Sequence, residues 1–278
     1  MKKIILALSP QAINTHTISF AAYIAQLTRS SITGVLLDNL KAETALHIST
    51  DHEGTNINLE KKMPAMTREQ AGIIDETKRA FLTYCNEQGI ACQVHEDKGL
   101  AVEELILETR YADLLILDPE MSFAGHPEAI PTDFTRRVLL DAECPVFIAP
   151  LGFDGVEEIL FTYNGSANSM FAIRQFATLL PELHTRPVTV LQVNDTQDNQ
   201  QPALDKLKAW LETRYTTIHF HKLAGTPDAA LLSYLVEKTK TVAVLGAYGR
   251  SQLSQLFKPS AAKILIKTVP QPLFIAHK

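Results

Sequence analysis

Ala243-Val244-Leu245-Gly246-Ala247-Tyr248-Gly249, near the C-terminus, decides the fold, because an apolar strand runs there into a turn of the form Gly-x-x-Gly. Nine residues after this turn Pro259-Ser260 opens a predicted helix, and the chain closes on the apolar stretch 272–276. Glycine lets the backbone approach a ligand closely, and the free N–H groups at a helix N-terminus attract anions. The order of strand, turn and helix therefore predicts a phosphate site.

Much of this order recurs in the first half of the chain, which indicates a duplication. Residues 4–9 (IILALS) match residues 159–164 (ILFTYN), and residues 144–149 (CPVFIA) match residues 271–276 (QPLFIA). The two offsets are 155 and 127, so the first copy contains about 28 extra residues. We place them in the polar stretch 39–66 and expect an inserted loop there.

Within each copy, short apolar strands alternate with amphipathic helices, which predicts βαβ units around a mostly parallel sheet. We therefore predict two domains, residues 1–150 and 155–278, each with a doubly wound five-stranded sheet that binds ligands at the carboxyl ends of its strands. The strands are expected at 3–8, 33–37, 91–95, 113–117 and 146–149, and at 158–163, 188–193, 217–221, 241–245 and 273–276. Helices of the second domain are expected at 167–180, 203–215, 227–238 and 260–268.

Composition and charge exclude several classes of protein. The chain has 278 residues, 46% of them hydrophobic, and a net charge of −5, which fits a soluble globular protein and argues against a nucleic-acid binder. The charge is −8 over residues 1–150 and +3 over residues 151–278, so an anion site is expected in the second half.

Targeting signals and disulfides are not expected either. The apolar stretch after Met1 stops at Ser9-Pro10, too short for a signal peptide, and we interpret it as a first strand. No stretch is long enough to span a membrane. Three cysteines without a CxxC pair (Cys85, Cys92 and Cys144) predict reduced, buried thiols, and hence a cytoplasmic protein.

Five strands, the glycine turn after the fourth strand and a Pro-apolar last strand together resemble the universal stress protein family, over nearly the whole chain, as two tandem copies. The family's nucleotide-binding copies have Gly-x-x-Gly, nine residues, then Gly-Ser/Thr. Here Gly246, Gly249 and Pro259-Ser260 stand at those positions. The resemblance implies a Rossmann-like, adenine nucleotide alpha hydrolase-like fold in each copy. It also implies a stress-response binding or regulatory module that takes ATP or another adenine nucleotide.

The resemblance also assigns a site, position by position, in the second copy. The residues that would line it are Tyr163, Asn164, Val193, Leu245, Gly246, Gly249, Arg250, Ser260 and Ala261. Pro259 departs from the family pattern and has no N–H, and losing one hydrogen bond to a phosphate costs about 1.5–3 kcal/mol. Asn164 stands where the family usually has aspartate, which keeps a hydrogen-bonding side chain but removes its charge.

The first copy departs further. After its fourth strand it reads Asp118-Pro119-Glu120-Met121, with two carboxylates where phosphates would lie, and its next helix starts at an ordinary N-cap pair, Thr132-Asp133. We therefore expect at most one nucleotide site, in the C-terminal half.

Alternatives to a nucleotide-binding module stay open. The chain has no G-x-S-x-G or Walker lysine motif and no nucleophile with an evident partner, so we expect no enzymatic activity beyond slow nucleotide hydrolysis at most. His219 and His221 alternate on one strand, but no third ligand has a convincing spacing, so no metal site is predicted. The rival hypothesis is a scaffold that keeps the fold, binds no nucleotide and captures a protein or a small ligand through its helix faces or the 39–66 loop.

The last strand of each copy predicts how the copies meet. Residues 145–149 and 272–276 would be sheet-edge strands, and exposed edges invite pairing. Domains of the similar family often dimerise through this strand. We therefore predict a pseudo-dimer within one chain, which leaves a further homodimer possible and the protein partner unknown.

Overall fold

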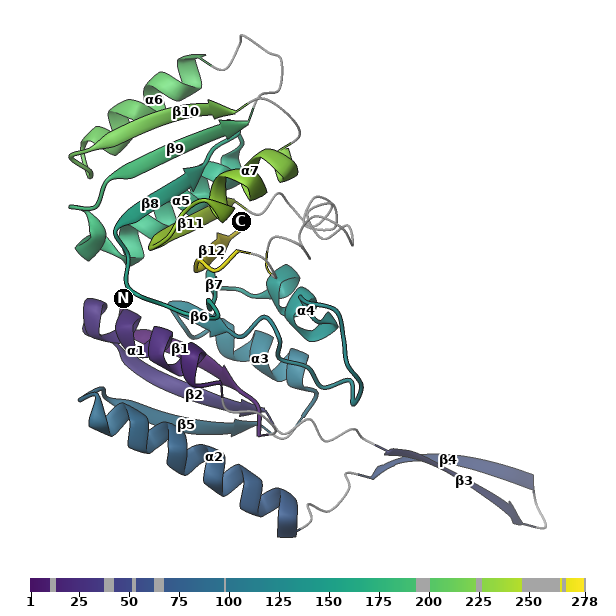
Figure 1. Ribbon diagram of the computed structural model, residues 1–278. Coiled ribbons are helices and arrows are strands. Elements are labelled where there is room, and N and C mark those ends of the chain that lie inside the picture. The colour runs from purple at the N-terminus through teal and green to yellow at the C-terminus, as the bar shows by residue number, and fades with distance from the viewer. Residues whose placement is uncertain are drawn as a thin grey trace.

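The computed structural model describes residues 1–10, 14–37, 43–51, 54–62, 68–97, 99–193, 201–223, 227–246, 266 and 269–277. Within them, the strands form one ten-stranded sheet and a separate two-stranded hairpin (Figure 1). The ten-stranded sheet passes through both halves of the chain.

The first half contains five parallel strands connected mainly through helices. Its strand order across the sheet is β5-β2-β1-β6-β7. These elements are β1 (Lys3–Leu8), α1 (Thr15–Thr28), β2 (Ser31–Leu37), α2 (Arg68–Glu87), β5 (Cys92–Asp97), α3 (Ala101–Thr109), β6 (Leu114–Leu117), α4 (Asp133–Asp141) and β7 (Val146–Ile148).

The second half repeats this topology, with the strand order β10-β9-β8-β11-β12. It contains β8 (Glu158–Thr162), α5 (Ala167–Leu179), the 3₁₀ turn η1 (Pro181–Leu183), β9 (Val188–Val193), α6 (Gln201–Glu212), β10 (Ile218–Leu223), α7 (Pro227–Val236), β11 (Thr241–Gly246) and β12 (Leu273–Ala276). The predicted helix at 260–268 lies outside the described residues, apart from Ile266, which is helical. The two doubly wound parallel sheets that the sequence predicts are confirmed.

The two halves meet through their last strands, as predicted. β7 pairs with β12 in antiparallel fashion, with Phe147 opposite Phe274, so the two five-stranded sheets become one. The rings of Phe147 and Phe274 lie edge to face, with centroids 5.1 Å apart. The pseudo-dimer within the chain is therefore present, and β5 and β10 are left as the outer edges of the sheet.

Helices cover both faces of the sheet because its central strands are apolar on both sides. Along β1, Ile4, Leu6 and Leu8 pack into one core and Ile5 and Ala7 into the other. The first core is completed by side chains of α1, α2, α5 and α6, and the second by side chains of α3, α4 and α7. A parallel sheet covered in this way leaves only the strand ends and the two edges open to ligands.

The prediction of a loop at 39–66 is wrong in one respect, because most of this segment forms a β-hairpin. Strands β3 (Glu43–Asp51) and β4 (Gly54–Lys62) pair in antiparallel fashion, with Leu46 opposite Leu59. The stretch is polar, but its apolar residues recur at every second position, a strand period that the sequence interpretation missed. The hairpin is inserted between β2 and α2 and projects away from the sheet (Figure 1).

Cys85, Cys92 and Cys144 are free thiols. Cys85 and Cys144 are buried, as predicted, but Cys92 on the edge strand β5 is only half-buried. Burial raises the pKa of Cys144 to about 12, so this thiol is not a nucleophile at neutral pH. In the described part of the chain, every helix is too short or too polar to cross a membrane.

Candidate functional site

The predicted site lies where the strand order of the second half reverses. The chain runs from β8 outward to β9 and β10, and then crosses back to β11 and β12 on the other side of β8. Thr162 Oγ1 at the end of β8 donates a hydrogen bond to the carbonyl of Val244 in β11, at 3.0 Å. The carboxyl ends of β8 and β11 are thus held together at the switch point, where doubly wound sheets bind their ligands.

Tyr163, the first predicted site residue, contributes its backbone and not its side chain to this edge. Its N–H donates to the carbonyl of Leu191 at 3.0 Å, which keeps β8 against β9. The side chain is buried in the core, and the hydroxyl donates to the carbonyl of Ala203 in α6 at 3.5 Å. Burial raises the pKa of the Tyr163 hydroxyl, so this group stays neutral at physiological pH.

Asn164 positions the start of α5. Its Oδ1 accepts a hydrogen bond from the Ser166 N–H at 3.1 Å, and Gly165 between them has a positive φ of 80°. Ser166 is the N-cap of α5, and its Oγ accepts from the Ser169 N–H at 3.1 Å. The turn after β8 therefore aims the N-terminus of α5 toward the carboxyl ends of the strands.

Gly246 is buried at the end of β11, directly against α5. A Cβ at this position would lie 2.6 Å from the Ser169 nitrogen, closer than real Cβ atoms come to backbone. The close packing of β11 on α5 thus requires glycine here, apart from any ligand. This packing reason could not be read from the Gly-x-x-Gly pattern.

The structure brings only part of the predicted site together. The carboxyl ends of β8, β9 and β11 are adjacent. They bring together Tyr163, Asn164, Val193, Leu245 and Gly246. The other predicted residues, Gly249, Arg250, Ser260 and Ala261, lie outside the described residues.

The corresponding place in the first half is occupied by the chain's own side chains. By strand register, Asp118 follows β6 where Gly246 ends β11. Asp118 is buried, and its Oδ2 accepts from Nδ2 of Asn14, the N-cap of α1, at 2.7 Å. Its Oδ1 accepts from the Glu120 N–H at 2.9 Å, so both carboxylate oxygens are used.

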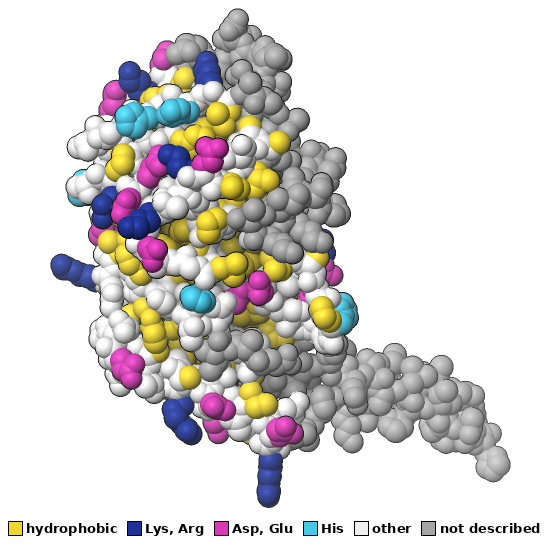
Figure 2. Space-filling model, viewed as in Figure 1, with side chains coloured by type: hydrophobic (Ala, Val, Ile, Leu, Met, Phe, Trp, Pro, Cys, Tyr) yellow, Lys and Arg dark blue, Asp and Glu magenta, His cyan; other side chains and the backbone are white. Residues whose placement is uncertain are grey.

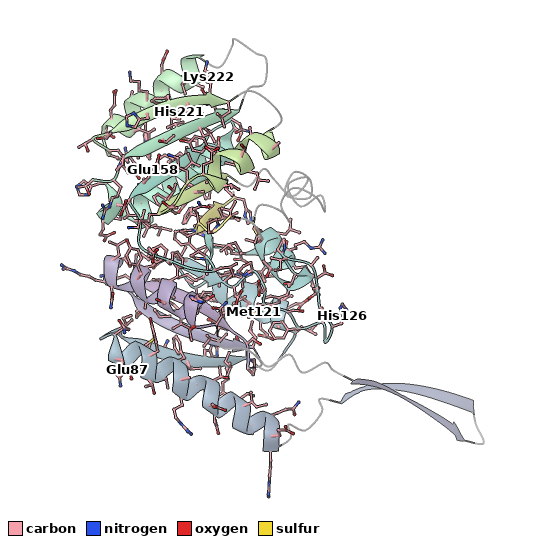
Figure 3. The ribbon with its side chains drawn as sticks, viewed as in Figure 1. Glu87, Met121, His126, Glu158, His221 and Lys222 are labelled. Carbon is pink, nitrogen blue, oxygen red and sulfur yellow. The ribbon has the colours of Figure 1, made fainter. Side chains whose placement is uncertain are left out.

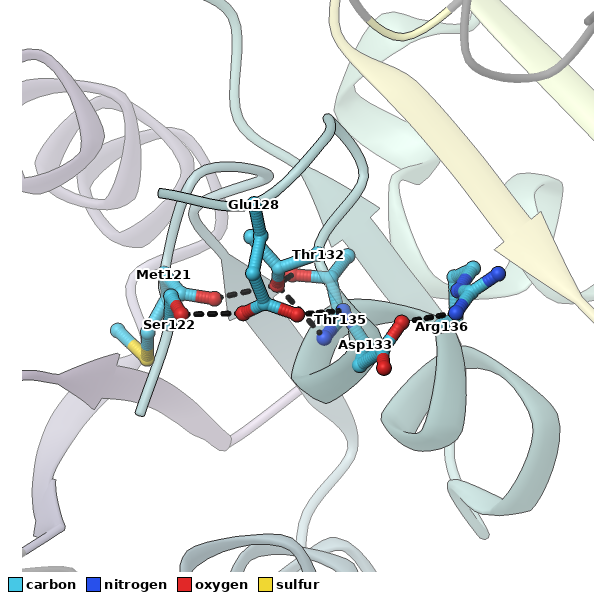
Figure 4. Close-up of polar contacts among 7 residues, drawn as sticks. All are labelled: Met121, Ser122, Glu128, Thr132, Asp133, Thr135 and Arg136. Carbon is cyan, nitrogen blue, oxygen red and sulfur yellow. Dashed lines mark hydrogen bonds and ion pairs between the residues drawn. The ribbon is translucent and has the colours of Figure 1, made fainter. Parts of the chain in front are cut away.

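The second carboxylate is that of Glu128, at the N-terminus of α4 (Figure 4), and not that of Glu120, whose side chain is exposed. Glu128 Oε1 accepts from the Asp133 N–H at 3.1 Å, and Oε2 accepts from the Ser122 hydroxyl. Thr132 is the N-cap, as predicted, and accepts from the Thr135 N–H at 3.2 Å. The helix start that would face a phosphate in this copy is thus already bound to an anion of the protein itself.

One cluster of ligand-type side chains was missed in the sequence. His95, Asp97 and Glu108 place donor atoms within 4.8 Å of one another, and the described residues contain no other group of this kind. The signal was His95 and Asp97 alternating on a strand; Glu108 is brought to them only by the fold. His219 and His221 are exposed on β10, where Figure 2 shows histidine side chains at the surface.

Comparison with known proteins also finds universal stress proteins, at low sequence identity. No protein-family model matches the chain. Universal stress protein Slr1230 from Synechocystis is 23% identical over 283 aligned positions, which cover 96% of this chain and 97% of that protein.

Two solved structures match the fold over nearly the whole chain. A universal stress protein from Archaeoglobus fulgidus matches with a TM-score of 0.70 and 16% identity, covering 99% of this chain and 98% of the other. A Pseudomonas aeruginosa PAO1 protein described as functionally unknown matches with a TM-score of 0.60 and 15% identity, covering 100% and 92%. The chain is therefore similar to universal stress proteins over its whole length, in sequence and in fold, as a tandem of two copies.

Proposed function

We propose that this chain is a stress-response binding and regulatory module with a single adenine-nucleotide site in its second half. Two findings support the proposal: the similarity to universal stress proteins over the full length, and the reversal of strand order between β8 and β11. No catalytic role is assigned to any residue.

The observation that carries the proposal is the difference between the two switch points. In the first half, Asp118 and Glu128 place carboxylates where phosphates would bind, and both are hydrogen-bonded to the protein. In the second half, Gly246 has no side chain at the position of Asp118, and the local sequence offers Arg250 instead of acidic residues. A polyanionic ligand is repelled by the first arrangement and accepted by the second.

Each proposed site residue then has a physical role. The turn from Gly246 to Gly249, the N–H groups of Ser260 and Ala261 and the charge of Arg250 would bind the phosphates. Asn164 would hydrogen-bond the ribose, and the adenine would lie beside Val193 and Leu245. The backbone of Tyr163 supports this edge. A bound nucleotide would bias the conformation of the glycine turn, and a protein partner would recognise that state.

Isothermal titration of the full chain with ATP, ADP and AMP tests this proposal. We expect one nucleotide per chain, and at least tenfold weaker binding for Gly249→Asp, which adds a negative charge beside the phosphates. Gly152→Asp is the matched control, because a side chain there meets no atom within 4 Å. Absence of heat at millimolar nucleotide, or equal binding by the Gly249→Asp protein, contradicts the proposal.

A second candidate function follows from the hairpin. Strands β3 and β4 pair only with each other among the described strands and project from the body of the molecule (Figure 1). An isolated two-stranded hairpin is only marginally stable in water, so a protein partner that covers it would stabilise it. This arrangement favours a scaffold that captures a partner through the hairpin.

Replacing residues 43–62 by a short Gly-Ser linker separates the two functions. If the protein is a scaffold, the linker variant keeps its melting temperature and loses capture of its partner from a lysate of the source cells. If it is a nucleotide-binding module, the titration with ATP is unchanged by the replacement. Since the hairpin lies outside the ten-stranded sheet, we expect the fold to survive.

A further inference from the structure

The cluster of His95, Asp97 and Glu108 lies at an outer edge of the sheet, away from both switch points. His95 and Asp97 alternate on β5, which is an edge strand, so both side chains lie on the same face. Glu108 comes from the last turn of α3, the helix that packs on this face of β1 and β2. The fold thus brings Glu108 close to His95 and Asp97, although it follows Asp97 by eleven positions in the chain.

The donor atoms of these residues converge. His95 Nδ1 lies 3.1 Å from Glu108 Oε1, and His95 Nε2 lies 3.6 Å from Asp97 Oδ1. One donor atom from each residue can be chosen so that all three lie within 4.8 Å of one another. A tetrahedral Zn²⁺ with bonds of about 2.0–2.1 Å places its ligand atoms about 3.3 Å apart, so small side-chain rotations suffice.

The environment of Asp97 favours a cation beside its carboxylate. Its side chain is only 13% exposed, and Oδ2 is fully buried and accepts no hydrogen bond from the described residues. Lys3 Nζ lies 3.6 Å from Glu108 Oε2 and so compensates the charge of Glu108. A buried carboxylate oxygen without a partner is unfavourable, and a bound cation removes this cost.

Solvent reaches the cluster through an adjoining cavity. The cavity has a volume of about 410 Å³ and is lined by Lys3, Thr33, Gln93, Val94, His95, Glu108 and Tyr111. An ion can therefore enter, and water can complete its coordination.

We propose that His95, Asp97 and Glu108 bind one divalent transition-metal ion, with Zn²⁺ as the probe of choice. One imidazole and two carboxylates form the mixed nitrogen and oxygen set that Zn²⁺ accepts, whereas Mg²⁺ and Ca²⁺ prefer oxygen ligands only. The bound ion would tie edge strand β5 to the end of α3. This site is independent of the proposed nucleotide site, since it shares no residue with it.

The second half provides an internal control at the same position of the fold. Strand register places His221 of β10 where His95 lies in β5, and Leu223 where Asp97 lies. His221, labelled in Figure 3, is exposed, and its ring is 6.2 Å from that of Tyr234 in α7. With leucine in place of the second ligand, this copy lacks the cluster.

The test is isothermal titration of the chelator-treated full chain with ZnCl₂, with MgCl₂ as the second probe. We expect one Zn²⁺ per chain, binding at least tenfold weaker in His95→Ala and in Asp97→Asn, and unchanged binding in His221→Ala. Lys3→Gln is expected to bind severalfold more tightly, because a competing cation is removed.

Thermal unfolding gives a readout that does not depend on titration heats. Saturating Zn²⁺ should raise the melting temperature of the native chain by about 5 °C and leave that of His95→Ala unchanged. Circular dichroism of the metal-free variants verifies that they are folded. Lack of Zn²⁺ binding by the native chain, or equal binding by His95→Ala, overturns the proposal, as does Mg²⁺ binding of equal strength.

Discussion

At the N-terminus of α4, the Glu128 carboxylate occupies the place that an anionic ligand would take. It accepts the N–H of Asp133 and the hydroxyl of Ser122, and so attaches the segment after β6 to the helix (Figure 4). A carboxylate at this position also interacts favourably with the positive end of the helix dipole. One acidic residue thus stabilises the first copy and closes its switch point.

Replacing Glu128 by alanine should therefore lower the free energy of unfolding by about 1–3 kcal/mol, because two charge-assisted hydrogen bonds are lost. Urea unfolding followed by circular dichroism measures the change. Glu120→Ala, which removes the same charge from an exposed side chain of the same segment, should have little effect. Equal stability of the two variants would show that Glu128 does not fasten the segment.

Glu158, at the start of β8, is the second residue whose charge stabilises the folded protein (Figure 3). It accepts from Thr189 Oγ1 at 2.7 Å and from Lys238 Nζ at 2.9 Å. Burial alone would raise the pKa of the carboxyl, but the hydrogen bonds from Thr189 and Lys238 outweigh burial and lower it. In the first copy the matching residue is Lys3, which faces Glu108, so the charges are reversed between the copies.

A lowered pKa in the folded state predicts a specific pH dependence. The stabilisation by Glu158 is fully present above the ordinary value of 4.5 and is lost as the pH falls through the lower value of the folded state. Glu158→Gln should lower the free energy of unfolding by about 1 kcal/mol at pH 7, and this difference should be smaller at pH 3. Urea midpoints at both pH values provide the measurement. Glu157→Gln, in a more exposed pair with Lys240, serves as the control, and a pH-independent difference would refute the assignment.

At the scale of elements, the contact between β11 and α5 determines the geometry of the proposed site. Gly246 is buried against Ser169 at the start of α5, and α5 is itself aimed by Asn164 and Ser166. The position of the glycine turn therefore depends on helix packing as well as on the residues of the turn.

Gly246→Ala should destabilise the protein by about 1–3 kcal/mol, because its Cβ would overlap backbone atoms that cannot rotate away. Differential scanning calorimetry should show a lower melting temperature for this variant and an unchanged one for Gly152→Ala, where the added methyl group meets open space. If Gly246→Ala melts with the native protein, β11 does not pack on α5 as described.

The sequence predicted the strands of the ten-stranded sheet and the described helices that cover it well, and the inserted hairpin poorly, for a physical reason. Strands buried on both faces, such as β1 and β11, are continuous apolar runs that stand out in any sequence. The hairpin of β3 and β4 alternates apolar with polar residues in a polar segment, and its period was overlooked. The burial of Tyr163 and the cluster around Glu108 depend on packing between distant segments, which no local pattern encodes.

At the scale of the whole molecule, the two copies form one body with two unequal switch points. Edge-to-face ring contacts cross the junction, from Phe20 of α1 through Phe147 and Phe274 to Phe176 of α5. Together with the pairing of β7 and β12, these rings join the copies into a continuous sheet and core. The first switch point is closed by Asp118 and Glu128, so we propose one nucleotide site in a molecule with two copies.

The most direct measurement of this central claim is a crystal structure of the full chain grown with millimolar ATP. We predict nucleotide density at the carboxyl ends of β8 and β11, beside Asn164 and Gly246. In the first half, Glu128 should still accept the Asp133 N–H. Nucleotide bound at the N-terminus of α4, or no nucleotide in either half, would contradict this claim.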